Sequence, residues 1–164
     1  MQYVTTADDG DSCVFCDGLK QNDDESARIL HRGRDVFVIL NAFPYNSGHL
    51  MIAPNRHIGE LHDLSVPERA ELMEMTNSAI GVLGAALEPH GFNVGMNLGR
   101  VAGAGIPGHL HVHVVPRWGG DTNFMPVVGE TKVLPEMLAD TAAKLRPFFS
   151  SLPTPSVGTQ EKND

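Results

Sequence analysis

The sequence is poor in cysteine, in basic residues and in long apolar runs, and each shortage excludes a class of protein. Only Cys13 and Cys16 occur among 164 residues, which excludes a disulfide-stabilised scaffold. The 12 lysines and arginines are outnumbered by 20 acidic residues, and the formal net charge of −8 argues against a nucleic-acid-binding surface. No apolar run approaches the roughly 20 residues of a membrane span. A small anionic ligand stays possible, because a local site can be positive on an acidic protein.

The two ends of the sequence differ in composition from the middle. Residues 1–11 and 150–164 are polar, so we expect a flexible N-terminus and a flexible C-terminal tail. Residues 12–149 have the length of a single domain with a sizeable core. The first residues lack the basic and apolar regions of a secretory signal peptide, so we expect a cytoplasmic protein.

Hydrophobic periodicity predicts strands that follow one another and two separate helices. Strands are predicted at 27–32, 35–41, 49–53, 92–98 and 109–115, and helices at 65–88 and about 134–148. Ser65 and Glu68 have the spacing of a capping box at the start of the first helix. Strands in runs with segregated helices predict an α+β fold with an antiparallel sheet.

Three histidines alternate with aliphatic residues in the segment 109–115, and this is the most informative pattern in the chain. Alternation with period two predicts a strand whose aliphatic residues point into a core and whose histidines share the other face. The three histidines would then lie about 6.6–6.8 Å apart along that face. Histidine is not a favoured strand residue, so three in register predict a functional site rather than the polar face of an edge strand. They are His109, His111 and His113.

A glycine-rich loop, residues 99–108, precedes the histidines. It contains the spacing G-x-G-x-x-G at Gly103, Gly105 and Gly108, but a dinucleotide-binding motif must follow a strand and open a helix. Here Pro107 and the histidine strand follow instead. We therefore predict a tight loop whose backbone N–H groups approach an anion, with a plain hairpin connection as the alternative.

These motifs together resemble the histidine triad (HIT) superfamily of nucleotide hydrolases and transferases. The segment 109–115 matches the family's H-φ-H-φ-H-φ-φ motif, and 40–50, 54–58 and 97–99 resemble its other motifs. The segment 116–124 resembles bacterial diadenosine tetraphosphate phosphorylases. The resemblance implies a HIT-like fold, with an antiparallel sheet of about five strands, one long helix and one C-terminal helix, and a homodimer.

The resemblance also implies a mechanism. His111 would be the nucleophile on the α-phosphate of a dinucleoside polyphosphate or another nucleoside 5′-phosphate derivative. It would form a covalent nucleotidyl-histidine intermediate that water or another acceptor resolves. His113 would assist at the phosphate, as a protonated histidine can stabilise charge on a phosphoryl oxygen. His49 would support the catalytic strand.

The nucleotide-binding positions follow from the same resemblance. The ribose hydroxyls are expected at Asn41. The phosphate is expected at Asn97, the backbone of Gly105 and Ile106, and His113. The nucleobase is expected in an apolar slot near Phe15 and Phe37. One departure stands out, because the residues 105–108 are Gly-Ile-Pro-Gly and offer no side chain that could donate a proton to a leaving group.

The pair Cys13 and Cys16 has the spacing C-x-x-C, which alone fits either a metal site or a redox pair. A redox pair calls for a thioredoxin-like context that the sequence lacks. Some bacterial members of the resembled family bind a structural zinc through such a pair together with two histidines. Transferred here, the ligands are Cys13, Cys16, His57 and His109, and the alternative is two reduced thiols.

Two other functions fit the same histidines. In the first, the three histidines hold a catalytic zinc, and the protein is a zinc-dependent phosphoesterase. In the second, the protein is a nucleotide-binding module without turnover, although such a module would not need an intact nucleophile. In each case we expect a nucleotide ligand, with no nucleic acid and no membrane as partner.

Overall fold

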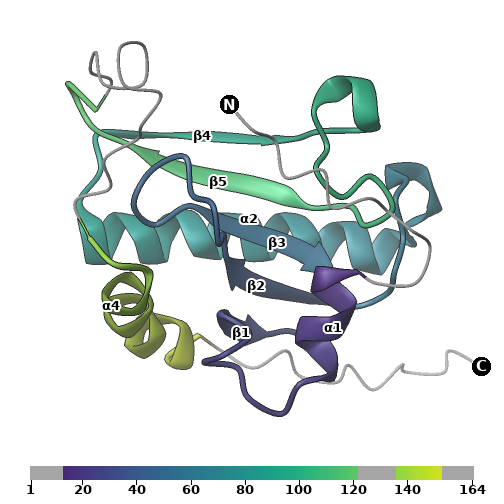
Figure 1. The fold of residues 1–164 in the computed structure, drawn as a ribbon, viewed down its shortest axis with the longest axis horizontal. Coiled ribbons are helices and arrows are strands. Elements are labelled where there is room, and N and C mark those ends of the chain that lie inside the picture. The colour runs from purple at the N-terminus through teal and green to yellow at the C-terminus, as the bar shows by residue number, and fades with distance from the viewer. Residues whose placement is uncertain (1–12, 122–135, 153–164) are drawn as a thin grey trace, which may run out of the picture.

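The computed structural model of the chain describes residues 13–121 and 136–152 (Figure 1). The strands are β1 Ile29–Arg32, β2 Val36–Leu40, β3 Leu50–Pro54, β4 Gly91–Met96 and β5 Val112–Arg117. The helices are α1 Val14–Lys20, α2 Val66–Leu87 and α4 Leu138–Ser150, with short 3-10 turns η1 Leu61–Asp63 and η2 Arg100–Ala102. The five strands form one antiparallel sheet in the order β1-β2-β3-β5-β4, which confirms the predicted α+β fold class.

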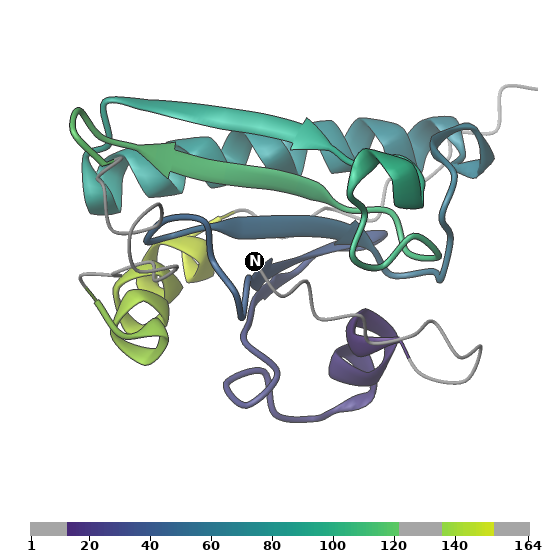
Figure 2. The same cartoon turned by 45° about the horizontal axis from the view of Figure 1, so that its top comes forward.

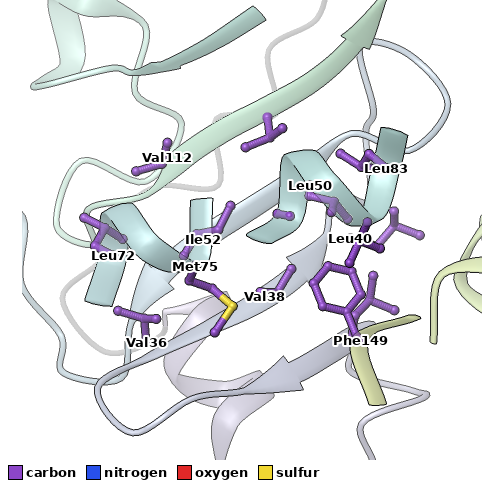
Figure 3. Close-up of a cluster of buried hydrophobic side chains, with 14 of the residues drawn as sticks. Val36, Val38, Leu40, Leu50, Ile52, Leu72, Met75, Leu83, Val112 and Phe149 are labelled. Carbon is purple, nitrogen blue, oxygen red and sulfur yellow. The ribbon is translucent and has the colours of Figure 1, made fainter. Parts of the chain in front are cut away.

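The sheet separates two hydrophobic clusters. On one face, α2 and α4 pack over alternate residues of β2, among them Val36, Val38 and Leu40, and Figure 3 shows these side chains meeting those of α2. On the other face, α1 covers Phe37 and Ile39 of the same strand, and Figures 1 and 2 show it opposite α2. The uninterrupted apolar run of β2 therefore reflects burial on both faces.

The long helix α2 begins where the sequence predicts. Ser65 is its N-cap: the Ser65 hydroxyl accepts a hydrogen bond from the Glu68 N–H at 3.4 Å, and the Glu68 carboxylate accepts one from the Ser65 N–H at 2.7 Å. Arg56 donates a further hydrogen bond to Glu68 at 2.6 Å. This network fixes the residues that follow β3, close to the predicted metal ligand His57.

The structure corrects the sequence-based prediction at three places. The seven-residue helix α1 was not expected, and it is too short for a helical period to show. The predicted strand 109–115 begins as a strand only at Val112 and continues through Pro116. Proline is tolerated there because pairing with β3 ends at Val114, so β5 has only one neighbour beyond that point. The last helix is Leu138–Ser150, so the first residue of the predicted C-terminal tail is helical. The predicted helical residues 134–135, the N-terminal residues 1–11 and the tail from 153 onward lie outside the described residues.

Candidate functional site

The histidine segment follows the predicted alternation. Leu110, Val112 and Val114 are buried in the cluster beneath α2, so the histidines between them face the side of the sheet that α1 covers. The first two histidines precede the ladder of β5, and a hydrogen bond from the Leu110 N–H to the Ile58 carbonyl at 2.6 Å holds this part of the chain. Each histidine is thus placed by backbone contacts before any ligand arrives.

His111 presents one ring nitrogen for chemistry. Its Nδ1 lies 2.8 Å from the carbonyl oxygen of His109, and since a carbonyl only accepts, Nδ1 must carry the proton of the neutral ring. The lone pair is then on Nε2, the atom that a nucleophile needs free. Burial lowers the pKa of His111, which favours the neutral ring at pH 7. The ring of Phe15 packs beside it, with centroids 5.1 Å apart.

A chain of hydrogen bonds fixes the proton of His113 as well. The Tyr45 N–H donates to Nδ1 of His49 at 3.0 Å, so the proton of a neutral His49 is on Nε2. That Nε2 lies 2.9 Å from Nδ1 of His113, which must accept it. His113 therefore carries its own proton on Nε2, and its ring centroid lies 4.8 Å from that of His111.

His113 differs from expectation in its charge. Burial, and then the neighbouring His111, lower the pKa of His113 to about 4, so the free protein holds a neutral ring at pH 7. The protonated helper that chemical reasoning favoured is replaced by a neutral one whose Nε2–H is oriented by His49. A neutral N–H donor can still form a hydrogen bond to a phosphoryl oxygen.

Asn41 and His49 bracket a turn that shapes the edge of the site. The Asn41 Oδ1 accepts a hydrogen bond from the Phe43 N–H at 2.9 Å, and its Nδ2 lies 3.4 Å from Nδ1 of His49. Gly48 makes the turn with φ of +75°, and a Cβ there would lie 2.6 Å from a methyl group of Leu87. Only glycine fits this position, which delivers His49 to the start of β3.

The glycine-rich loop lies on the same side as the histidines. Asn97 follows β4, and its Nδ2 donates to the Gly103 carbonyl at 3.3 Å, which closes the turn of η2. Gly105 is exposed and Ile106 is half-buried against the α1 cluster. Within the described part of the chain, the N–H groups of Gly105 and Ile106 have no acceptor, so both can serve an anion.

The four predicted metal ligands come together in one cluster. One ligand atom from each of Cys13, Cys16, His57 and His109 lies within 4.8 Å of all the others. Nδ1 of His109 lies 3.3 Å from Sγ of Cys13 and 3.6 Å from Sγ of Cys16. Sγ of Cys16 also lies 3.4 Å from Nδ1 of His57. Tetrahedral zinc with two sulfur and two nitrogen ligands needs such atoms about 3.3–3.8 Å apart.

The surroundings of the cluster suit a metal. Nε2 of His109 lies 2.8 Å from the Pro54 carbonyl, so it carries the proton and leaves Nδ1 bare toward the sulfurs. Burial, and then the neighbouring Cys13, raise the pKa of the Cys16 thiol to about 11. Such crowding of two thiols is relieved when a cation displaces their protons. The residues present therefore fit a metal ion of the zinc type.

The same geometry argues against a catalytic metal held by three triad histidines. In residues 13–121 and 136–152, the cluster of two cysteines and two histidines is the only group of three or more such side chains able to share an ion. His109 belongs to it, whereas Nδ1 of His111 and of His113 are engaged elsewhere. A cluster that could hold a metal ion therefore lies beside a pair of histidines that do not belong to it.

The expected base slot is corrected by the structure. Phe15 and Phe37 are both fully buried, with 0% of either side chain exposed, because α1 packs them onto the sheet. Neither can stack on a ligand from solution. A cavity of about 280 Å³ opens beside them, between α1, β2 and the segment before β1. Its lining comprises Val14, Asp17, Gly18, Gln21, Ser26, Ala27, Arg28 and Ile39.

The sequence also did not predict the hydrogen bonds that hold the turn of residues 41–49 in place. Asp121 accepts two hydrogen bonds from Arg117, at 2.6 and 2.7 Å, and one from Nδ2 of Asn46 at 2.9 Å. Nδ2 of Asn46 also donates to the Pro116 carbonyl at 3.1 Å. The turn that carries Asn41 and His49 is thereby tied to the end of β5. The segments are 75 residues apart, so no local pattern could reveal the contact.

In the described part of the chain, no helix has the length and apolar character needed to cross a bilayer.

Comparison with known proteins agrees with this geometry. The HIT domain family matches residues 22–120. An AP-4-A phosphorylase from Mycobacterium tuberculosis is 49% identical over 135 residues, which are 82% of this chain and 69% of that protein. An adenosine 5′-monophosphoramidase from Schizosaccharomyces pombe is 26% identical over 106 residues, 65% of this chain and 74% of that protein. A Zn-bound histidine triad family protein from Mycobacterium smegmatis shares the fold, with a TM-score of 0.69 and 23% identity over 85% of this chain and 94% of that one.

Proposed function

The chain belongs to the HIT domain family, and from that membership we propose that it is a nucleotidyl hydrolase or transferase acting on dinucleoside polyphosphates or related nucleoside 5′-phosphate derivatives. The observation that carries the proposal is the pair of free ring atoms at the site. Nε2 of His111 has a lone pair and Nε2 of His113 has a proton, and both assignments follow from hydrogen bonds of the other ring nitrogen.

The first step forms a bond between Nε2 of His111 and the α-phosphorus while the bond to the leaving oxygen breaks. Neutral imidazole is a competent nucleophile, and its burial keeps it unprotonated near pH 7. The Nε2–H of His113 donates to a non-bridging phosphoryl oxygen as charge develops. The products are a nucleotidyl-His111 intermediate and the released remainder of the substrate, which for a dinucleoside polyphosphate is a nucleoside polyphosphate.

In the second step, an acceptor oxygen attacks the same phosphorus and the N–P bond breaks, which restores His111. Water as the acceptor makes the reaction a hydrolysis, and inorganic phosphate makes it a phosphorolysis. No side chain between Gly105 and Gly108 can protonate the first leaving group. A nucleoside polyphosphate leaves readily as an anion, so the lack of a proton donor favours dinucleoside polyphosphates over substrates with a basic leaving group.

The proposal places the nucleotide along the α1 face of the sheet. The phosphate contacts the N–H groups of Gly105 and Ile106, together with Asn97 and His113, and the ribose lies at Asn41. The base then enters the cavity beside α1. Two facts support this: Ile39 lines the cavity two residues before Asn41, and Val14 lines it next to Phe15, whose ring contacts His111.

Zinc is proposed as a structural ion held by Cys13, Cys16, His57 and His109. Bound there, it would supply folding energy and would steady His109, whose backbone carbonyl orients His111. Because His111 and His113 lie outside the cluster, the chemical step needs no metal.

A cytoplasmic homodimer completes the proposal. Strand β4 is an edge of the sheet and exposes about half of the Val94 side chain, and α2 exposes 60% of Met73, which leaves apolar surface for a second copy. Sedimentation of the full chain at micromolar concentration should give a dimer, and a monomer would contradict this part.

The test of the proposed function is product analysis with diadenosine tetraphosphate, with and without inorganic phosphate. AMP plus ATP in both conditions identifies a hydrolase, whereas ADP plus ATP that depends on phosphate identifies a phosphorylase. If the protein consumes neither dinucleoside tetraphosphates nor adenosine phosphoramidates, the proposed enzymatic activity is rejected. The remaining hypothesis is then a nucleotide-binding module without turnover. Loss of turnover on metal removal from protein that stays folded would instead support the zinc-dependent phosphoesterase.

A further inference from the structure

The cavity beside α1 is lined by an arginine whose guanidinium has no partner among the described residues. Arg28 lines the cavity, and its Nε is buried without an acceptor. Among the residues that the structure describes, Arg28 and Arg100 are the two arginines whose side chains make no hydrogen bond or ion pair, and Arg28 alone lines the cavity. A buried donor without an acceptor is destabilising, so this position is explained most simply by a ligand that supplies one.

The backbone holds Arg28 in an unusual conformation. Its φ of +60° places it in the left-handed region, where residues other than glycine are uncommon. Glu88 shares this feature, but Glu88 ends α2, where such a conformation is ordinary. Arg28 is fixed there because its N–H donates to the Glu25 carbonyl at 3.0 Å and its carbonyl accepts from the Leu40 N–H at 2.9 Å. The backbone from which this side chain extends is therefore fixed before a ligand binds.

The polar groups around the cavity differ in what they can accept or donate. The Arg28 guanidinium only donates, and the carboxylate of Asp17 only accepts. Asp17 is held by Lys20 on the exposed side of α1, at 3.3 Å. Ser26 is already bonded to Asp23 at 2.6 Å, so its hydroxyl is engaged. The apolar part of the lining comes from Val14, Ala27 and Ile39.

We propose that this cavity selects a 6-oxopurine, guanine above all, and that Arg28 is the specificity-determining residue. Guanine presents two adjacent acceptors, O6 and N7, which match the guanidinium fork, and N–H donors on its other edge, which match Asp17. Adenine presents an amino group in place of O6 and an acceptor in place of the ring N–H, so both matches are lost. The alternative is that the exposed amide of Gln21 recognises the base, which would favour adenine.

This inference rests on the proposed function, because it takes the base to lie in the cavity while the α-phosphate lies at His111. It names guanosine-containing substrates, such as diguanosine polyphosphates, as those the site favours. A bidentate arginine contact is worth about 5- to 150-fold in discrimination against the wrong base.

The test is calorimetric binding of GMP, IMP and AMP to the full chain, which needs no turnover. GMP and IMP should bind at least about fivefold more tightly than AMP. Arg28→Gln should remove this preference by weakening GMP and IMP while leaving AMP nearly unchanged. Arg28→Lys keeps the charge but loses the fork, and should behave like Arg28→Gln. Arg34→Gln, the same change at an exposed arginine bonded to Asp35, is the matched control and should keep the preference.

The outcomes separate this inference from the proposed function. AMP binding as tightly as GMP to the unaltered chain would overturn the guanine preference and leave the nucleotide site standing. Equal losses for GMP and AMP in Arg28→Gln would show a charge effect and would also overturn it. Failure of all three mononucleotides to bind would reject the nucleotide site itself. If the Arg28 variants unfold, the ratio of GMP to AMP affinity in the unaltered chain still decides the question.

Discussion

His109 and His111 lie two residues apart on one face of the same segment, yet the backbone prepares them for different chemistry. The Nε2–H of His109 donates a hydrogen bond to the Pro54 carbonyl, which leaves Nδ1 for the sulfurs of Cys13 and Cys16. The Nδ1–H of His111 donates a hydrogen bond to the His109 carbonyl, which leaves Nε2 open. The proposed metal ligand and the proposed nucleophile thus differ by which ring nitrogen meets a carbonyl oxygen.

The comparison also shows how the two centres are joined. The carbonyl that orients His111 belongs to His109 itself, so a metal bound at His109 steadies the residue that fixes the tautomer of the nucleophile. His49 does the equivalent for His113 from another strand. Each of the two proposed reacting rings is therefore oriented by a second histidine, His111 by the backbone carbonyl of His109 and His113 by the ring of His49.

Replacing the nucleophile should have the largest effect. His111→Ala should lower kcat by at least roughly a thousandfold, because it removes the ring nitrogen that is proposed to form the covalent bond. The metal content should stay unchanged, since His111 lies outside the cluster. Steady-state kinetics with elemental analysis on the same preparation checks both parts. Near-normal turnover in this variant would break the distinction between the two histidines.

Replacing His113, the proposed hydrogen-bond donor to the phosphate, should have the next largest effect on kcat. His113→Ala should lower kcat by roughly 10²–10³, the loss typical for one donor that stabilises developing charge. The affinity for the mononucleotide should change little by comparison. If His113→Ala lowered kcat as much as His111→Ala does, the two histidines would have to act together in the same step.

Disrupting the metal centre should affect stability more than chemistry. Cys13→Ser should bind less metal and lose on the order of several kcal/mol of unfolding free energy, because metal binding contributes to folding. His109→Ala should behave alike but also lower kcat, because the backbone carbonyl that orients His111 loses the anchor that the His109 ring makes to Pro54. Thermal unfolding and metal analysis test this. Protein prepared without chelators that holds no metal would contradict the structural-ion proposal.

The pH dependence of stability sharpens the comparison further. The pKa of His113 is about 4 in the folded protein against 6.5 for an ordinary histidine, so between these values the unfolded chain binds more protons. The unfolding free energy should therefore decrease as pH falls from 6.5 to 4. In His113→Asn this decrease should be smaller, as measured by denaturant titration at each pH. An equal slope in both proteins would mean that His113 is not held neutral.

The positions of the histidines on one face of their segment could be predicted because the sequence pattern that encodes them is local. Alternation with period two puts His109, His111 and His113 on one face whatever the rest of the fold does, and the structure keeps that alternation. The capping box at Ser65 and Glu68 is equally local. The C-x-x-C spacing suggested a metal, but its two histidine partners came from the family resemblance.

The rest depends on contacts between distant segments. The tautomer of His109 is set by Pro54, which is 55 residues away, and no spacing encodes it. Phe15 and Phe37 were expected to hold the base, but α1 folds back and buries both. Arg28 gives no signal in the sequence, since its role depends on a left-handed backbone and on a cavity formed by three segments.

The most direct test is to trap the intermediate. Substrate labelled at the α-phosphate is mixed with the enzyme and quenched in alkali, because N–P bonds are labile in acid, and the labelled peptide is mapped. The label should lie on His111 through Nε2, and should be absent from His111→Ala and from His109. Fast turnover without any trapped label, together with near-normal rates in His111→Ala, would contradict the covalent mechanism.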